Sequence, residues 1–271
     1  TVSEDYTSLN TGTYFKKAPK VTFSAEDSGV GVGTYTFDGK KTTDDTFNLG
    51  DGEHTVAVAD WLDNTDKVVS VADLMGWRSN KVVIDGTAPS VGRKSGFTPD
   101  KQKSGEDWYK KKPSLVYTVT DTNLRYVDIT VNGKLYRNHS RVNGDYTVDL
   151  SSVSDGKVSV QIRVEDCAGN VSEDSYNFNL DTKHPSGLKA ELTGSYLERD
   201  TGTFFKATPS VRFSAEDEGI GVDKYYLNGE SKRDGMFNLP TGIYTVYADD
   251  ELGNKTRTSK VSDLLGWKSN R

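Results

Sequence analysis

The stretch Val158-Ser-Val-Gln-Ile-Arg-Val-Glu-Asp-Cys-Ala-Gly-Asn170 joins a regular alternation to a turn signal. Aliphatic side chains occupy every second position from Val158 to Val164, and polar side chains stand between them. Because successive side chains of a β-strand point to opposite faces, the alternation predicts a strand with one buried and one wet face. Gly169 and Asn170 adopt positive φ readily, so the segment 166–170 should form a tight turn.

The same strand and turn recur on either side of this stretch. Shorter strands around Val56 and Val246 lead into Asp60-Trp-Leu-Asp-Asn64 and Asp250-Glu-Leu-Gly-Asn254. A second pattern, an aromatic pair followed by Lys and Pro, opens an alternating strand that ends in Asp. Its copies are Tyr14-Phe15-Lys16 to Asp27, Trp108-Tyr109-Lys110 to Asp121, and Phe204-Phe205-Lys206 to Asp217. Because both patterns recur once in each third of the chain, the sequence indicates tandem domains.

Two linkers separate these copies. Asp85-Gly-Thr-Ala-Pro89 and Asp181-Thr-Lys-His-Pro185 share an Asp-x-x-x-Pro pattern. They predict three domains, at residues 1–86, 87–182 and 183–271. A linker of this kind is missing before the first domain, and a final strand like that of residues 81–85 is missing after the third. We therefore expect a fragment of a longer array, with the first domain truncated at its N-terminal end and the third at its C-terminal end.

Each domain should be a two-sheet sandwich. Hairpin signals follow an apolar strand in every copy, at Asp38-Gly39, Asn132-Gly133 and Asn228-Gly229. No helical periodicity longer than about two turns competes with the short strands. The fold class is therefore all-β, with three tandem immunoglobulin-like β-sandwich domains in an elongated array.

The order of strand, Asp166-Cys-Ala-Gly-Asn170 turn, further strand and Asp85-Gly-Thr-Ala-Pro89 linker resembles the bacterial Ig-like repeats of large cell-surface and adhesin proteins. The resemblance covers the whole chain, although its motifs are short and indicate architecture better than ligand. It implies an extracellular location, at the cell surface or attached to the cell wall. It also implies a role in adhesion or as a spacer.

Composition excludes several classes of function. The chain has 34 Lys and Arg against 40 Asp and Glu, so it lacks the basic surface that binding nucleic acid requires. No run of 18 apolar residues is present, which argues against a membrane span in this sequence. Cys167 is the single cysteine, so neither an internal disulfide nor a cysteine metal site can form.

No catalytic constellation is visible either. The histidines at 54, 139 and 184 have no second His or Cys at metal-ligand spacing. Cys167 stands where Trp61 and Glu251 stand in the sister turns, which indicates a tolerant position rather than a nucleophile. Ser28-Gly-Val-Gly-Val-Gly33 looks like a phosphate loop, but its counterpart Glu218-Gly-Ile-Gly-Val222 carries a carboxylate and leads from strand to strand. We expect a protein that is not an enzyme.

Calcium is the cofactor with the most physical support. Eight aspartates lie at strand ends or in linkers, where carboxylates could converge on a cation that takes six to eight oxygens. They are Asp27, Asp60, Asp85, Asp121, Asp166, Asp181, Asp217 and Asp250. Aspartate at a strand end is also what turn chemistry alone predicts. We therefore assign no metal, and keep Ca²⁺ at the domain junctions as the alternative.

The tryptophans are the candidate ligand contacts. Trp77 and Trp267 lie in a matching insertion of about ten residues, around Gly-Trp-Arg/Lys-Ser-Asn, which the second domain lacks. An indole flanked by amides and cations suits the C–H face of a sugar ring. The preferred interpretation is a plug that closes one end of the sandwich. Trp61 has no aromatic counterpart and is the better candidate for a surface contact, whereas Trp108 should be core.

The charge distribution suggests a contact between neighbours. The first domain holds 8 basic and 14 acidic residues and so carries the whole net charge of −6. The second domain begins with a basic segment, which contains Arg93, Lys94, Lys101, Lys103 and Lys110-Lys-Lys112. A head-to-tail electrostatic match is conceivable. A solvated basic face is preferred, because exposed ion pairs contribute little.

These patterns lead to one expectation and one alternative. We expect a non-catalytic part of a bacterial surface protein, in which the repeats act as adhesion or spacer modules. The alternative is a carbohydrate-binding accessory region of a secreted glycan-degrading enzyme. The partners would be a host or environmental glycan or a protein ligand, with Trp61, Trp77 and Trp267 as contacts, and the chain would be a monomer.

Overall fold

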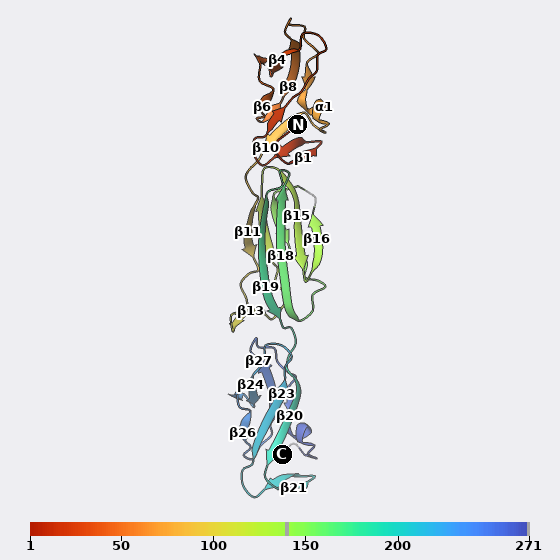
Figure 1. Ribbon diagram of the computed structural model, residues 1–271. Coiled ribbons are helices and arrows are strands. Elements are labelled where there is room, and N and C mark those ends of the chain that lie inside the picture. The colour runs from red at the N-terminus through yellow and green to blue at the C-terminus, as the bar shows by residue number, and fades with distance from the viewer. Residues whose placement is uncertain (139–140, 270–271) are drawn as a thin grey trace.

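The computed structural model describes residues 1–138 and 141–269, so His139 lies outside the described residues. Three β-rich units follow one another along a single long axis, and the long strands of the middle unit run along that axis (Figure 1). No helix among the described residues is long and apolar enough to cross a membrane. The architecture is that of an elongated all-β array.

The middle unit has the longest strands. Its alternating stretch forms β18, whose valines and isoleucine face inward while Ser159 and Gln161 face water. Two sheets, β11-β14-β17 and β12-β13-β19-β18-β15-β16, enclose the core. The strands are β11 (Ser90–Ser95), β12 (Lys101–Lys103), β13 (Glu106–Tyr109), β14 (Val116–Thr120), β15 (Leu124–Val131), β16 (Lys134–Asn138), β17 (Gly144–Thr147), β18 (Gly156–Asp166) and β19 (Val171–Leu180).

The first unit divides similar strands among three smaller sheets, β1-β2-β10-β7, β5-β4-β8-β9 and β3-β6. Its last strand, β10, pairs in parallel with β2 and antiparallel with β7. Its elements are β1 (Tyr6–Leu9), β2 (Gly12–Phe15), β3 (Lys20–Thr22), β4 (Val32–Phe37), β5 (Lys40–Thr42), β6 (Thr46–Asn48), β7 (Gly52–Glu53), β8 (Thr55–Asp60), β9 (Val69–Ser70), α1 (Val71–Met75) and β10 (Lys81–Ile84).

The third unit follows the plan of the first. Its sheets are β20-β23-β26, β21-β22 and β25-β24-β27-β28. Its elements are β20 (Ser186–Thr193), β21 (Tyr196–Arg199), β22 (Gly202–Phe205), β23 (Ser210–Glu216), β24 (Val222–Leu227), β25 (Glu230–Lys232), β26 (Met236–Asn238), β27 (Thr245–Asp250), β28 (Ser259–Lys260) and α2 (Val261–Leu265).

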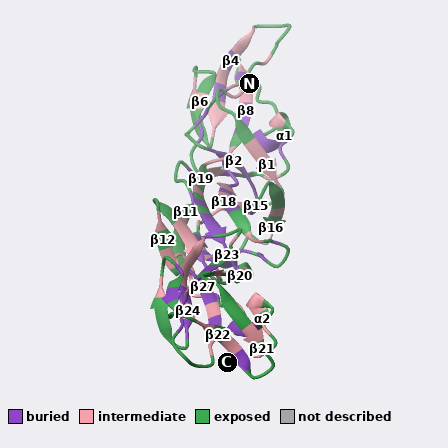
Figure 2. Cartoon of the chain, turned by 90° about the horizontal axis from the view of Figure 1, so that it is seen from below, coloured by how far each residue is buried: buried purple, intermediate pink, exposed green. Residues whose placement is uncertain are grey.

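Each unit has its own hydrophobic core. The core of the first unit lies within residues 15–82, that of the second within 109–180 and that of the third within 211–261. Figure 2 shows buried residues, in purple, on the strands, whereas many of the loops are exposed. The boundaries at 86/87 and 182/183 stay predictions.

The three hairpin turns form as the sequence predicts. Each has positive φ at both central residues, with 47° and 78° at Asp38-Gly39, 47° and 81° at Asn132-Gly133, and 46° and 94° at Asn228-Gly229. These are the dihedrals of type I′ turns, whose twist matches that of the flanking strands. The strands that the hairpins join pair antiparallel in every unit.

The insertion that carries the tryptophans is more regular than a loop. It contains the short helices α1 and α2, which no periodicity in the sequence indicates. The Ser70 hydroxyl accepts a hydrogen bond from the Asp73 amide at the start of α1, and Gly76 closes that helix at φ 67°. Capping of this kind stabilises a single helical turn because it satisfies terminal backbone groups.

Candidate functional site

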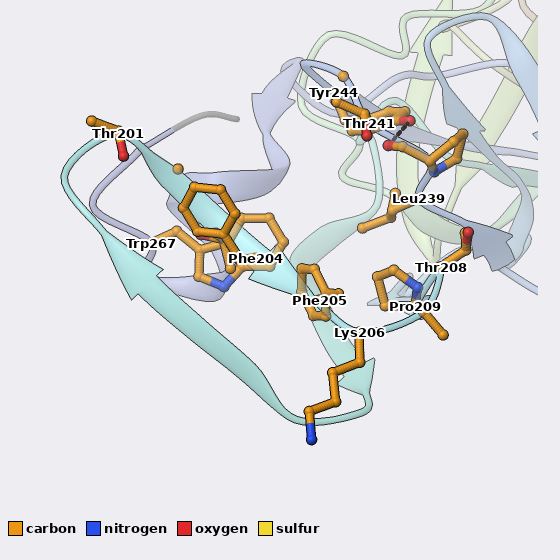
Figure 3. A pocket seen from close by; sticks show the side chains of 15 residues that line it. Thr201, Phe204, Phe205, Lys206, Thr208, Pro209, Leu239, Thr241, Tyr244 and Trp267 are labelled. Carbon is orange, nitrogen blue, oxygen red and sulfur yellow. Dashed lines mark hydrogen bonds between the residues drawn. The ribbon is translucent and has the colours of Figure 1, made fainter.

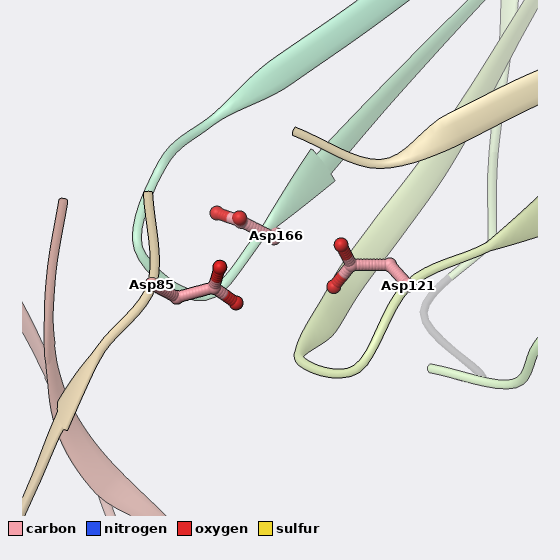
Figure 4. Close-up of side chains that lie close together, drawn as sticks. All are labelled: Asp85, Asp121 and Asp166. Atoms are coloured by element: carbon pink, nitrogen blue, oxygen red, sulfur yellow. The ribbon is translucent and has the colours of Figure 1, made fainter. Parts of the chain in front are cut away.

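Two clusters of three aspartates lie where one unit joins the next. Cluster 1 consists of Asp85, Asp121 and Asp166, and cluster 2 of Asp181, Asp217 and Asp250. Within each cluster, one oxygen of every carboxylate lies within 4.8 Å of the others. Figure 4 shows the three side chains of cluster 1, which reach the same space from three separate segments. Each cluster combines a linker aspartate with two aspartates from the end of the following unit.

Local hydrogen bonds hold the carboxylates of cluster 1. Asp166 accepts hydrogen bonds from the backbone and side-chain amides of Asn170, at 2.8 and 2.7 Å. Asp121 accepts the backbone N–H of Asn123 at 2.7 Å, and the Asn123 side chain donates to Asp85 at 2.6 Å. The aspartates of cluster 1 therefore form turns, as the sequence predicts, and also lie close to one another.

Cluster 2 repeats this arrangement with a tighter approach. Asp250 accepts the backbone and side-chain N–H groups of Asn254, at 2.8 and 2.6 Å. Asp181 accepts the Ile220 N–H at 2.8 Å, across the junction. A Cβ added to Gly219 would lie 1.9 Å from Asp181 Oδ2, so glycine at this place leaves room for the linker carboxylate.

The carboxylates repel one another. Burial, together with the nearby charges of Asp166 and Asp85, raises the pKa of Asp121 above its usual range. Burial also raises the pKa of Asp166 and, with the charges of Asp217 and Asp250, the pKa of Asp181. None of the six carboxylates forms an ion pair with Lys or Arg in the part of the chain that the structure describes. Unneutralised oxygen donors at this spacing fit a hard divalent cation.

The sequence named all six cluster residues and kept convergence at the junctions as an alternative, but it did not show which aspartates group together. Asp27 and Asp60, the remaining two of the eight predicted candidates, belong to the first unit and are in neither cluster. Asp27 accepts the N–H groups of Gly29 and Gly31, at 3.0 and 2.8 Å, as a turn former does. The Asp-x-x-x-Pro spacing of the linkers is the signal that could have pointed to the clusters, because it places one aspartate at each junction.

Apolar contacts join the first and second units. Cys167 is 3% exposed and packs with Tyr14 and Ala168, against which the half-buried Leu9 and Val83 also lie. Burial raises the pKa of the Cys167 thiol, so the structure gives it no thiolate character. The turn position that the sequence indicated as tolerant is an interface position.

Ionic contacts join the second and third units. Lys101 and Lys103 both pair with Glu251, which occupies the place of Cys167, at 2.6 and 2.8 Å. These lysines hold the pKa of Glu251 below its usual range. Lys110 donates to the carbonyl oxygen of Gly253 at 2.8 Å. Lys101 and Lys103 therefore depart from the expected solvated face, because the Glu251 carboxylate faces them across the junction, whereas Lys110 stays exposed. The partner lies in the third unit and not in the acidic first unit.

The tryptophans lie in different surroundings. The Trp61 side chain is 66% exposed, beside the exposed Leu62. Trp77 is 8% exposed, and its ring meets those of Phe15 and Tyr6 edge-on at 5.7 and 5.6 Å between centroids. The half-buried Trp267 meets the ring of Tyr196 edge-on at 6.1 Å and that of Phe205 at a tilt at 5.8 Å. Trp108, expected in the core, is half-buried beside the second junction.

A groove of about 590 Å³ lies beside Trp267 in the third unit. Figure 3 shows its wall, where Phe204, Phe205 and Trp267 from β22 and the insertion face Leu239 and Tyr244. Tyr244 donates to the carbonyl oxygen of Pro240 at 2.6 Å and so fixes the opposite rim. No carboxylate is among the residues that line the groove.

Known proteins resemble the chain in two comparisons. Residues 100–182 match the family described as bacterial Ig-like domain. A tetra-tandem repeat from the extending region of a large adhesion protein is 18% identical to this chain, with a TM-score of 0.33. The match covers 96% of this chain and 72% of the adhesion-protein chain. No curated protein matches the sequence.

Two further solved structures are similar. A Ca²⁺-stabilized adhesin that helps an Antarctic bacterium to bind ice is 17% identical, with coverage of 96% and 72% and a TM-score of 0.34. The fibronectin(III)-like modules of Clostridium thermocellum CbhA are 12% identical, with coverage of 63% and 91% and a TM-score of 0.30. The chain is an all-β array of tandem immunoglobulin-like units, and its residues 100–182 are similar to the bacterial Ig-like domain family.

Proposed function

We propose that the chain is a non-catalytic extender segment of a bacterial surface protein, and that calcium stiffens its two junctions. The observation that carries the proposal is the convergence of three carboxylates at each junction. The bacterial Ig-like match and the surface adhesins among the similar structures support an extracellular position. The segment would hold a binding region away from the cell.

The chain's own residues would act as a clamp. Asp85 follows the last strand of the first unit, whereas in the second unit Asp121 follows β14 and Asp166 ends β18. A bound calcium ion would neutralise the three carboxylates and complete its shell with carbonyl or water oxygens. Because the ligands come from the linker and from the next unit, the clamp would restrict bending at the junction. Cluster 2 would act in the same way.

Small-angle scattering tests the proposal. With 1 mM calcium we expect a narrow distribution of lengths for the array, and with excess chelator a broader one with a shorter mean length, because charge repulsion then opens the junctions. Magnesium at the same concentration is the control, since it demands a smaller and more regular octahedral shell. Identical scattering in calcium and chelator would contradict the clamp.

A second candidate function rests on Trp61. Its indole is 66% exposed on a turn, as a sugar-stacking side chain requires, whereas the burial of Trp77 favours the plug. If the chain binds glycans, Trp61→Ala should weaken binding to an immobilised glycan panel more than tenfold and leave the thermal midpoint unchanged. Trp77→Ala should instead lower the midpoint. Binding that survives Trp61→Ala would exclude this candidate.

A further inference from the structure

We propose that adjoining units recognise one another through a matched pair of positions, whose chemistry decides which unit can follow which. One position lies on the end face of the leading unit, at Leu9 or Lys103. The other is the second residue of the facing turn, at Cys167 or Glu251. An apolar end face therefore takes an apolar turn residue, and a basic end face takes an acidic one. The proposal does not depend on calcium.

The two turns, at residues 166–170 and 250–254, have the same backbone arrangement. In both, the N–H of the first residue donates to the carbonyl oxygen of the fifth at 3.1 Å. The Cys167 N–H donates to the carbonyl oxygen of Asn123 at 2.7 Å. The Glu251 N–H donates likewise to that of Gly221 at 3.1 Å. Each unit thus holds its turn with its own main chain, which leaves the side chain at the second position to contact the neighbouring unit.

The residues that face these turns also occupy equivalent places. β1 pairs with β2 so that Leu9 lies opposite Gly12, and β12 pairs with β13 so that Lys103 lies opposite Glu106. Gly12 and Glu106 each lie two residues before the aromatic pair of their unit. β2 and β13 correspond as well, because each pairs in parallel with the last strand of its unit. Leu9 and Lys103 therefore stand at the same place on two successive end faces.

The side chains at the two places change together. Leu9 packs against the buried cluster that contains Cys167. Lys103 pairs with Glu251 at 2.8 Å, and Lys101 pairs with the same carboxylate at 2.6 Å. Exchanging only one member would place an ammonium group against apolar side chains, or a carboxylate against leucine. Burial of an unpaired charge is unfavourable, so a mismatched pair would keep the two units from docking.

A contact common to both junctions gives no such discrimination. The lysine after each aromatic pair reaches the glycine of the facing turn. Lys110 donates to the carbonyl oxygen of Gly253 at 2.8 Å. Lys16 lies over Gly169, where an added Cβ would lie 3.5 Å from Lys16 Cε. Because this contact recurs, it can hold any two neighbours together, and the choice between neighbours falls to the matched positions.

Transfer of the apolar pair to the second junction is the first test. Glu251→Cys alone faces two lysines, and its thiol should react readily with a thiol reagent. Adding Lys101→Thr and Lys103→Leu should slow the reaction at least about tenfold, because burial of leucine favours the docked units. Cys167, 3% exposed, supplies the background rate in the unmodified chain. Lys103→Gln in place of Lys103→Leu is the control, since it removes only the charge. Equal rates with leucine and glutamine would overturn the proposal.

Transfer of the ionic pair to the first junction is the second test. Carbon-13 NMR can follow the carboxyl group that Cys167→Glu introduces. Its pKa should be lower when Thr7→Lys and Leu9→Lys are also present, as the two facing lysines lower the pKa of Glu251. About 1 M salt should remove most of this difference, since the Debye length is then about 3 Å. If the carboxyl group titrates identically with and without the lysines, the end face does not select the turn. One calcium concentration in all samples keeps the proposed clamp constant, so this failure would leave the clamp untouched.

Discussion

Asp121→Asn is expected to stabilise the second unit in chelator and to destabilise it in calcium. Without a cation, the substitution removes one of three mutually repelling carboxylates, whose pKa is raised by burial and by Asp166 and Asp85. The amide oxygen of Asn can still accept the Asn123 N–H that Asp121 accepts at 2.7 Å. With calcium, the unit loses an anionic ligand. A ligand at a hundredfold excess over its Kd contributes about 2.7 kcal/mol, so we expect the loss of roughly ten degrees in midpoint.

The pH dependence has a definite sign. A carboxyl whose pKa is higher in the folded than in the unfolded state favours folding as pH falls through the folded pKa, until the unfolded pKa is reached. In chelator, Asp121 and Asp166 should therefore add stability as pH falls below neutrality, and Asp121→Asn should reduce this gain. In calcium the dependence should reverse, because protons compete with the cation for the carboxylates.

Asp149→Asn is the matched control. Asp149 lies in the same unit and accepts the N–H of Ser151 at 2.8 Å, two residues on, as Asp121 does with Asn123. It belongs to neither cluster. The control should shift the midpoint by the same amount in calcium and in chelator. If Asp121→Asn also shifts it equally in both, Asp121 is a turn former only.

Ile162→Ala should lower the stability of the second unit and leave the other two unchanged. Ile162 is 0% exposed at the centre of the six-stranded sheet, opposite Ile129 on one side and Asp174 on the other. Truncation of a buried Ile costs about 2–5 kcal/mol, a large part of the ~5–15 kcal/mol that stabilises a domain. Differential scanning calorimetry should show one transition that moves down by ten degrees or more.

The remaining transitions test whether the cores are independent. Since the three cores share no residue, the transitions of the first and third units should move by no more than about two degrees. Gln161→Ala, on the exposed face of the same strand, should leave all transitions in place. A single transition that moves as a whole would contradict independent cores and the predicted boundaries.

Much of the fold follows from the sequence because it depends on local periodicity. The alternation from Val158 to Val164 places those side chains in the core, and Asn132-Gly133 closes a hairpin as its dihedrals require. The helix α1 could not be predicted in this way. Five residues give no periodic signal, and the helix depends on the caps at Ser70 and Gly76.

The junctions were harder to predict because they depend on contacts between units. Lys103 and Glu251 are far apart in the sequence, and no local pattern pairs them. The convergence of Asp85 with Asp121 and Asp166 depends likewise on how the linker meets the next unit. An alignment of the repeats helps to predict these contacts, because equivalent residues occupy equivalent positions in successive units.

The parallel pairing of β10 with β2 and of β19 with β13 has a mechanical consequence. The long strands of the second unit run along the array (Figure 1), and the chain leaves this unit through β19. Tension along the array would therefore pull β19 lengthwise past β13 and β18, where Asn179 lies between Trp108 and Lys157. Strand-to-strand hydrogen bonds lie across the direction of this pull, so they would resist together in shear rather than open one after another.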